Sequence, residues 1–290
     1  MKVLVLGSTG YIGSAVARQL MADGHQAVHL VKDAERLGPD AASRVGDLRD
    51  PASLRAAVTD DIDAVLNLAT PTGEETVDAA AVGALTEGLR GTGRAFVYTS
   101  GVWVLGATGD TAVGEDAATD AITIVGYRPR IEQRVLAAAA EDVRAVVLRP
   151  GIVYGHGGGI PGLMTGWAKE HGISRYVGSP ATRWPMVHVD DLAELFVLAL
   201  TRAEPGTVLH GVAHEAVPVA ALAAAADVAA GGTGRAEPWP LDQAAEAVGA
   251  PFAEALALNQ VVSGYRAVAE LGWRPRRPYV LDELTGGDRG

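Results

Sequence analysis

The stretch Lys2-Val-Leu-Val-Leu-Gly-Ser-Thr-Gly-Tyr-Ile-Gly13 decides the fold of this chain. Its apolar start is typical of a buried strand, and Gly7, Gly10 and Gly13 then spell G-x-x-G-x-x-G at the opening of a helix. The first glycine allows a tight turn, the second lets the backbone approach a pyrophosphate, and the third lets helix and strand pack closely. The pattern predicts a dinucleotide-binding turn. The alternative is a tight strand–helix turn without a ligand.

The composition of the 290 residues excludes several classes of protein. There is no cysteine, so disulfides, thiolate metal sites and a cysteine nucleophile are excluded. The net charge of −11 argues against a nucleic-acid-binding surface, and a hydrophobic content of 48% argues against general disorder. No apolar run approaches the ~20 residues of a membrane span, and the start of the chain has no basic leader. We expect a cytoplasmic protein with neither nucleic acid nor membrane as a partner.

Short apolar runs alternate with helix-period segments in the first half of the chain, which indicates a parallel sheet covered on both faces. Residues 155–187 are instead rich in Gly, Pro and Trp. We predict an α/β protein with a Rossmann-type, doubly wound parallel sheet over residues 1–155. A smaller C-terminal substrate lobe follows over residues 156–290, and a segment at about 187–212 returns to the sheet. Ligands of such folds bind at the carboxyl ends of the strands.

Five further motifs follow the glycine motif in order. They are Gly46-Asp-Leu48, Asn67-Leu-Ala69, Arg149-Pro-Gly-Ile-Val-Tyr-Gly155, Val187-His-Val-Asp-Asp-Leu-Ala193 and Leu271-Gly-Trp-Arg-Pro275. With them the chain resembles, over nearly its whole length, the extended short-chain dehydrogenase/reductases, the NAD-dependent epimerase/dehydratase group. The resemblance implies that Asp47 contacts adenine and that the Arg-Pro-Gly segment backs the nicotinamide. The predicted cofactor-binding residues are Gly7, Thr9, Gly10, Tyr11, Ile12, Gly13, Lys32, Asp47, Leu48, Ala69, Thr99, Pro150 and Gly151.

The end of the second predicted strand indicates which cofactor binds. NAD-binding proteins usually carry an acid there for the ribose 2′-hydroxyl, and NADP-binding proteins a base for the 2′-phosphate. Lys32 stands about where the base is expected, Asp33 stands late for the acid, and Arg36 follows one turn later. These residues favour NADP, with NAD as the alternative; Lys32 as an exposed loop lysine is the other interpretation.

The catalytic pattern of the resembled family is incomplete in this chain. Family members that transfer hydride use a Ser or Thr after the fifth strand and a Tyr-x-x-x-Lys pair on the next helix. The hydroxyl position falls on Gly101, with Ser100 one residue before it. Tyr127 is followed four residues later by Ile131, and residues 33–168 contain no lysine. Without the lysine, the pKa of Tyr127 should stay near ~10, which makes it a poor acid at neutral pH.

Arg128 and Glu132 are the remaining candidates on this helix. At i and i+4 they share one face, where Glu132 would be a base and Arg128 an oxyanion clamp. The alternative is an ordinary ion pair on the helix surface. The predicted catalytic residues are Ser100, Tyr127, Arg128 and Glu132.

The predicted substrate-binding residues are Trp103, His156, Arg183 and Trp184. His156 can titrate near neutral pH, Arg183 can bind a carboxylate or phosphate, and Trp184 can pack against an aromatic or sugar ring of the substrate. For His156 a loop histidine with one backbone bond is the alternative. His188 and Asp190 are expected to cap the next helix. No cluster at metal-ligand spacing is present, so no metal is predicted.

The sequence analysis predicts an NAD(P)-dependent oxidoreductase or epimerase-type enzyme acting on a small oxygenated substrate. One alternative is a non-redox lyase, isomerase or cyclase on the same fold. The other is a catalytically silent protein that senses NAD(P). Alanine-rich faces on residues 74–89 and 130–140 permit a homodimer, and nothing in the sequence excludes a monomer.

Overall fold

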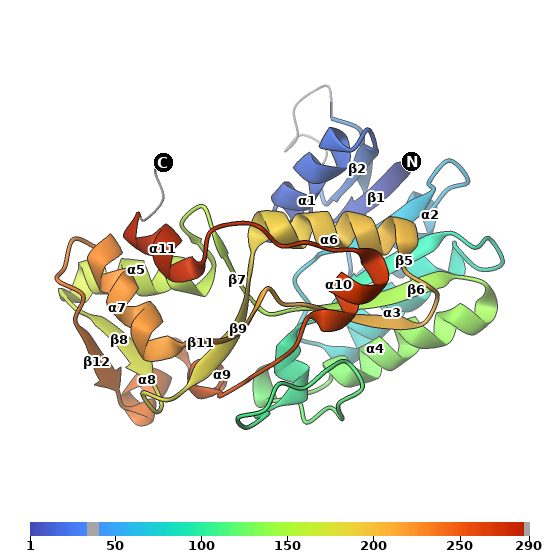
Figure 1. Cartoon of the computed structure of the whole chain (residues 1–290). Helices are drawn as coiled ribbons and strands as arrows, with labels where there is room; N and C mark the ends of the chain where they lie inside the picture. Colours follow the sequence, from blue (N-terminus) through green and yellow to red (C-terminus); the bar gives the residue numbers. More distant parts are fainter. Residues whose placement is uncertain (34–40, 287–290) are drawn as a thin grey trace.

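The computed structural model describes residues 1–33 and 41–286. At its centre lies a seven-stranded parallel sheet in the order β10-β6-β5-β4-β1-β2-β3 (Figure 1). The strands are β1 (Lys2–Leu6), β2 (Gln26–Val31), β3 (Ser43–Val45), β4 (Ala64–Asn67), β5 (Ala95–Thr99), β6 (Arg144–Pro150) and β10 (Thr207–Gly211). The strand order reverses between β1 and β4. A crevice outside the carboxyl ends of these two strands is the binding position expected of such sheets.

Helices cover both faces of the sheet (Figure 1). One face carries α1 (Tyr11–Ala22), α6 (Val189–Arg202) and α10 (Tyr265–Leu271); the other carries α2 (Pro51–Ala57), α3 (Glu75–Glu87) and α4 (Arg128–Ala137). Successive strand residues point to opposite faces, so Val3 and Val5 join the first core and Leu4 and Leu6 the second. Burial on both faces explains why β1 is a continuous apolar run.

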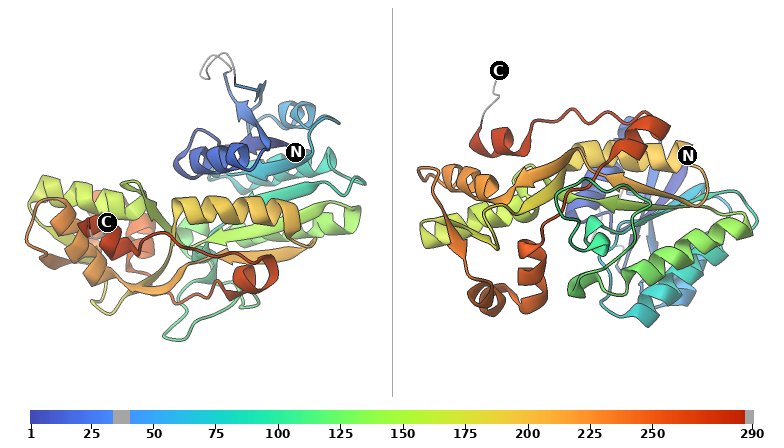
Figure 2. Two further views of the ribbon diagram at one scale, coloured as in Figure 1. Left: turned by 45° about the horizontal axis from the view of Figure 1, so that its top comes forward. Right: turned by 60° about the horizontal axis from the view of Figure 1, so that its bottom comes forward.

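A smaller lobe stands beside the carboxyl end of the sheet, as Figure 2 shows. It contains a three-stranded sheet of β7 (Ile152–Gly155), β9 (Arg183–His188) and β11 (His214–Pro218), and a pair formed by β8 (Ser174–Val177) and β12 (Ala236–Trp239). Its helices are α5 (Gly159–His171), α7 (Val219–Ala229), α8 (Leu241–Val248), α9 (Ala250–Ala257) and α11 (Val280–Thr285). A third apolar core holds these elements together.

The predicted Rossmann-type fold is confirmed, and β10 joins the main sheet beside β6. The division of the chain at residue 155 stays a prediction. In the part of the chain that the structure describes, no helix is long and apolar enough to cross a membrane.

Candidate functional site

The glycine loop joins β1 to α1 at the crevice. At Gly7 the φ angle is +73°, and an added Cβ would lie 2.5 Å from the carbonyl oxygen of Leu68. At Gly13 an added Cβ would lie 2.0 Å from the carbonyl oxygen of Gly7. No side chain tolerates either contact, so the loop requires glycine at both positions. Gly10 is the N-cap of α1 and has no side chain to cap it, which leaves the first backbone N–H groups able to bind an anion.

On the β2 side of the loop lies a cavity of about 430 Å³, which we name the polar pocket. It is lined by Leu6, Gly7, Thr9, Leu30, Val31, Lys32, Gly46, Asp47, Leu48, Arg49, Ala69, Thr70 and Thr72. Lys32 Nζ lies 3.0 Å from Asp47 Oδ2, and the backbone N–H of Arg49 donates to Asp47 Oδ1 over 3.0 Å. These contacts, the Arg49 hydrogen bond foremost, lower the pKa of Asp47. The structure thus brings six predicted cofactor contacts to one cavity: Gly7, Thr9, Lys32, Asp47, Leu48 and Ala69. Arg36 lies outside the described residues.

Arg49 is a lining residue of the polar pocket that the sequence analysis did not identify. Its guanidinium Nη2 lies 2.7 Å from Glu74 Oε1, and about half of the side chain is exposed. The signal in the sequence is its position, directly after Gly46-Asp-Leu48. Arg49 and Lys32 make two cations at one cavity, which suits a phosphate group.

On the other side of the loop lies a second cavity of about 260 Å³, which we name the apolar pocket. It is lined by Tyr11, Ile12, Thr99, Ser100, Gly101, Val102, Trp103, Pro150, Gly151, Ile152, Val153, Gly159 and Ile160. The structure therefore brings Ser100 and Trp103 together with Thr99, Pro150 and Gly151. Ser100 Oγ and Thr99 Oγ1 are buried and have no hydrogen-bond partner among the described residues. Buried hydroxyls normally have partners, and a molecule in the pocket would reach these two oxygen atoms only after the side chains rotate.

Tyr127 does not line the apolar pocket. Its hydroxyl donates to Asp78 Oδ2 over 2.5 Å, and Asp78 also accepts from the backbone N–H of Thr72. Burial, followed by the hydrogen bond and charge of Asp78, raises the pKa of Tyr127 to about 12. This value replaces the ordinary pKa that we expected from the missing lysine. The phenol is held protonated by a partner on α3.

Glu132 lies behind the wall of the apolar pocket and not in it. Arg149 Nε lies 3.0 Å from Glu132 Oε1, Arg149 Nη2 lies 2.6 Å from Glu132 Oε2, and both side chains are buried. A buried carboxylate requires such a partner, and Arg149 satisfies the requirement. The structure does not bring Glu132 together with Arg128, whose Nη1 donates to the carbonyl oxygen of Thr99 over 3.4 Å.

Arg149 and His210 form a polar layer behind the apolar pocket. His210 is the register partner of Arg149 on the neighbouring strand, is fully buried, and its Nδ1 lies 3.1 Å from the carbonyl oxygen of Ser263. Burial, followed by the charge of Arg149, lowers the pKa of His210 to about 4. His210 is therefore neutral at neutral pH. Sequence reasoning missed this layer because β6 and β10 are far apart along the chain.

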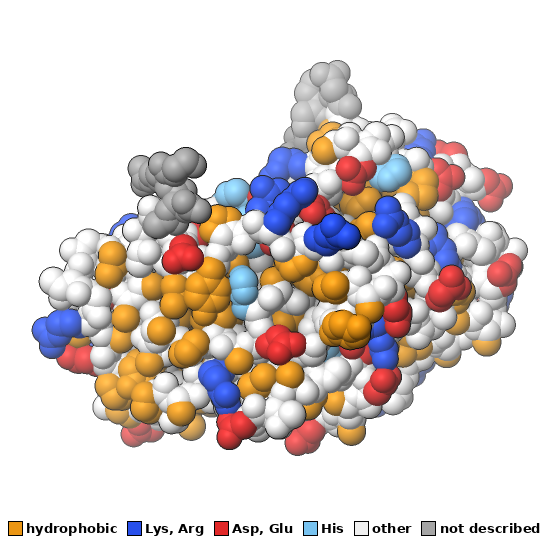
Figure 3. All heavy atoms as spheres, in the orientation of Figure 1, with side chains coloured by type: hydrophobic (Ala, Val, Ile, Leu, Met, Phe, Trp, Pro, Cys, Tyr) orange, Lys and Arg blue, Asp and Glu red, His pale blue; other side chains and the backbone are white. Residues whose placement is uncertain are grey.

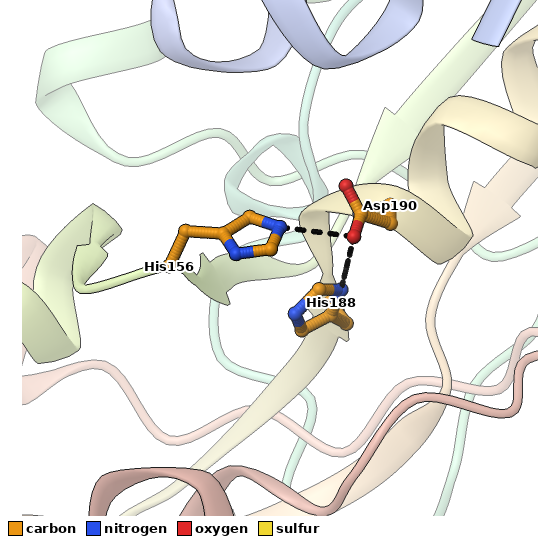
Figure 4. Close-up of side chains that lie close together, drawn as sticks. All are labelled: His156, His188 and Asp190. Carbon is orange, nitrogen blue, oxygen red and sulfur yellow. Dashed lines mark hydrogen bonds and ion pairs between the residues drawn. The ribbon is translucent and has the colours of Figure 1, made fainter.

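His156, His188 and Asp190 lie together at the start of α6 (Figure 4). The backbone N–H of Asp190 donates to His188 Nδ1 over 3.1 Å, which confirms that His188 caps this helix. His156 Nε2 lies 2.9 Å from Asp190 Oδ2, and His188 Nε2 lies 3.2 Å from Glu283 Oε2 on α11. The structure thus ties His156 to α6 and does not bring it to the apolar pocket.

The spacing of these three side chains would also suit a metal ion, because their donor atoms lie within 4.8 Å of one another. Two guanidinium groups stand beside the carboxylate, Arg18 at 3.8 Å and Arg277 at 4.0 Å from Asp190 oxygens. Figure 3 shows Lys and Arg side chains gathered over α1 and the start of α6. Cations in this position and the occupied His188 Nδ1 favour a hydrogen-bonded network over a metal centre. The prediction of no metal stays a prediction.

Arg183 and Trp184 lie on β9 and do not line the apolar pocket. The guanidinium of Arg183 forms an ion pair with Asp110, and its backbone N–H donates to Asn259 Oδ1 over 2.9 Å. Trp184 is 2% exposed and packs in the core of the lobe. The structure therefore places these two predicted substrate contacts in structural positions.

Comparisons with known proteins agree with this geometry. Residues 3–210 match the model of the NAD dependent epimerase/dehydratase family. The chain is 31% identical to "Uncharacterized protein C2A9.02" of Schizosaccharomyces pombe, with 98% of each chain covered. It is 30% identical to a 2-alkyl-3-oxoalkanoate reductase of Stenotrophomonas maltophilia, covering 74% of this chain and 69% of that protein. The crystal structure of human epimerase family protein SDR39U1 with NADPH matches with a TM-score of 0.76 at 25% identity, covering 99% of this chain and 98% of that one. The chain belongs to the NAD-dependent epimerase/dehydratase family.

Proposed function

We propose that the protein is an NADP-dependent oxidoreductase that interconverts a carbonyl and an alcohol in a small organic substrate. The observation that carries this proposal is the pair of cavities on the two sides of the glycine loop. The polar pocket offers two cations, and the apolar pocket offers two buried hydroxyls without partners among the described residues. A dinucleotide cofactor needs this division, because its adenosine end, which carries the 2′-phosphate of NADP, and its nicotinamide ring lie on opposite sides of the pyrophosphate.

The lining residues fit such a cofactor. The backbone of the glycine loop would hold the pyrophosphate, and Asp47 and Leu48 would contact the adenine. Lys32 and Arg49 would bind the 2′-phosphate, which favours NADP over NAD. The relative SDR39U1 was crystallised with NADPH, which agrees with this assignment.

The chemistry that the cofactor supplies when bound is hydride transfer. The chain must then handle one proton at the substrate oxygen. We assign this role to Ser100, whose buried hydroxyl lines the apolar pocket and is not used elsewhere in the described structure. Arg128 contacts the carbonyl oxygen of Thr99 from outside the lining, so we assign it no direct contact with the substrate oxygen. Tyr127 and Glu132 are held by Asp78 and Arg149, so Ser100 would give its proton to the substrate oxygen and regain one from a water molecule that enters the apolar pocket.

Titration with NADPH and NADH, followed by nicotinamide fluorescence, tests the cofactor assignment. We expect binding of NADPH at about micromolar concentration, tighter than that of NADH. Gly10→Glu places a carboxylate at the helix start and should weaken NADPH binding at least ~100-fold, because like charges repel there. Gly83→Ala on α3, where an added Cβ meets nothing within 4 Å, is the matched control. Unchanged NADPH binding by Gly10→Glu would contradict the assignment.

A second candidate function is an NADP-binding sensor without turnover. It is favoured by the bonds that hold Tyr127 and Glu132, because two groups able to move a proton are committed to structural partners. NADPH binding without oxidation across a panel of carbonyl compounds would support the sensor. Substrate conversion without net change of cofactor would instead support an epimerase.

We also propose a homodimer through α3 and α4. Light scattering, which measures the mass of the particle in solution, tests this proposal.

A further inference from the structure

We propose that the substrate is a compact, uncharged aldehyde or ketone with an apolar body, rather than a nucleotide sugar or a carboxylic acid. This inference rests on the proposed function, because it names the occupant of the apolar pocket in the same site. Three features carry it: the side chains that line the pocket, the bonds of the cations around it, and its size.

The lining of the apolar pocket suits an uncharged substrate that accepts a hydrogen bond through one oxygen atom. Among the described side chains that line it there is no Lys, Arg, His, Asp or Glu. Its polar side-chain groups are three hydroxyls and the indole N–H of Trp103, and the Tyr11 hydroxyl already donates to the carbonyl oxygen of Gly155 over 2.7 Å. The remaining groups are uncharged hydrogen-bond donors, which suit the oxygen of a neutral carbonyl compound. A phosphate or carboxylate buried here would lack a counter-charge, and that is strongly unfavourable.

The nearest arginines along the surrounding elements are bonded elsewhere. Arg183 on β9 pairs with Asp110, and Arg149 behind the wall pairs with Glu132. Arg18 on α1 faces Asp190 and lines the neighbouring cavity, which shares Tyr11 with the apolar pocket. Arg128 contacts the strand end from outside the lining. A charged substrate would therefore have to break an existing ion pair or rearrange Arg128.

The dimensions of the apolar pocket point to a small molecule. Its volume of about 260 Å³ lies below the ~300–1,000 Å³ of ordinary ligand sites, and the cofactor ring must share it. The lobe behind α5 offers little further space. Trp167 and Trp239 pack edge to face with ring centroids 5.6 Å apart, and the cavity beside them is about 10 Å³. This packing closes that side of the lobe, and a longer substrate would have to pass Tyr11 into the neighbouring cavity of about 570 Å³.

The test uses a pair of aldehydes that differ by one charge. The reaction balances as aldehyde plus NADPH plus one proton giving alcohol plus NADP⁺. We expect kcat/KM for benzaldehyde to exceed that for 4-formylbenzoate at least ~100-fold, since the second compound buries an unpaired carboxylate. UDP-glucose at about millimolar concentration should not inhibit. Equal or faster reduction of 4-formylbenzoate, or competitive inhibition by UDP-glucose, would overturn the substrate class while the proposed redox function stands.

Binding gives a second measurement that does not depend on turnover. In the NADP⁺ complex, benzaldehyde should quench the fluorescence of Trp103, whereas 4-formylbenzoate and UDP-glucose should not. Loss of the signal in Trp103→Phe assigns it to this residue. This result supports the substrate class even if no carbonyl oxidises NADPH, in which case the proposed redox function alone has failed. Quenching by the charged compounds at the same concentrations would overturn the inference.

A charge placed in the lining gives the sharpest test. Ile160→Lys puts an ammonium group at the apolar pocket and should raise kcat/KM for 4-formylbenzoate relative to benzaldehyde at least ~10-fold. Leu163→Lys, on an exposed position of the same helix outside the lining, is the matched control and should leave the ratio unchanged. An unchanged ratio in Ile160→Lys, with NADPH binding intact, would show that the substrate does not occupy this pocket.

Discussion

The polar pocket and the apolar pocket lie on the two sides of one glycine loop, but their walls are built differently. The polar pocket is lined largely by local motifs: the glycine loop, the end of β2 and the turn that holds Asp47. The apolar pocket collects the ends of β5 and β6 and the starts of β7, α1 and α5. Cofactor binding thus depends on short stretches of sequence, whereas the reaction depends on segments that only the fold brings together.

The same contrast extends behind the apolar pocket. Two of the ionisable groups that the sequence analysis predicted as catalytic have structural partners in this chain. Tyr127 is bonded to Asp78, and Glu132 is bonded to Arg149. We therefore expect substitutions behind the apolar pocket to alter the stability of the protein. Substitutions in the lining of the polar or the apolar pocket should instead alter binding or turnover.

The largest expected effect is on the stability of the Glu132–Arg149 pair. Glu132→Gln leaves the buried guanidinium without a counter-charge and should lower the free energy of unfolding by about 3–5 kcal/mol. Urea denaturation measures this loss. Glu141→Gln is the matched control, since it breaks the exposed pair with Arg90 and should cost at most about 1 kcal/mol. If the Glu132→Gln protein has normal stability but no activity, Glu132 is a catalytic residue and this prediction is wrong.

A second effect of about 3 kcal/mol is expected from the titration of His210. Its pKa is about 4 in the folded chain and about 6.5 when unfolded, so the unfolded state binds more protons between these values. This contribution to stability is present above pH ~6.5 and is lost as the pH falls towards 4. Urea denaturation as a function of pH measures it, and His210→Gln should flatten this part of the profile. His171→Gln, on an exposed residue, should leave the profile unchanged.

Ser100→Ala should lower kcat about 100-fold while NADPH affinity stays the same, because the hydroxyl acts on the substrate oxygen. Steady-state kinetics and cofactor titration separate the two quantities. Gly101→Ser added to this variant should restore part of the rate. The backbone at Gly101 is extended, and an added Cβ would meet only the carbonyl oxygen of Pro150 at 3.9 Å. If Ser100→Ala keeps full activity, the proton is handled by another group.

The smallest effect concerns the choice of cofactor at the polar pocket. Lys32→Ala should weaken NADPH binding about tenfold, or about 1.4 kcal/mol, and leave NADH binding unchanged, because only NADPH carries the 2′-phosphate. The ratio of the two dissociation constants measures this. Lys169→Ala on α5 is the control for general loss of positive charge. An equal loss for both cofactors would show that Lys32 acts through Asp47 and not on the phosphate.

The sequence by itself determined the parallel sheet, the glycine loop and the polar pocket. Each depends on neighbouring residues: a buried run such as Val3–Leu6, glycines at fixed spacing, and Asp47 within its own turn. Arg49, Thr70 and Thr72 were missed there, although Arg49 lies directly after the motif. Local geometry is readable from spacing, because the chain itself sets these distances.

Only the tertiary structure decided which ionisable groups reach the apolar pocket. The helix spacing of Arg128 and Glu132 gave no sign that Arg149, from β6, would bind the carboxylate behind the wall. Nor did the chain near His210 reveal its position beside Arg149. A buried charge takes whichever partner the packing brings within reach, and strands distant in sequence become neighbours only when the sheet forms. The physical reason is that burial and pairing are properties of the assembled core, whereas turns and strands are properties of the local chain.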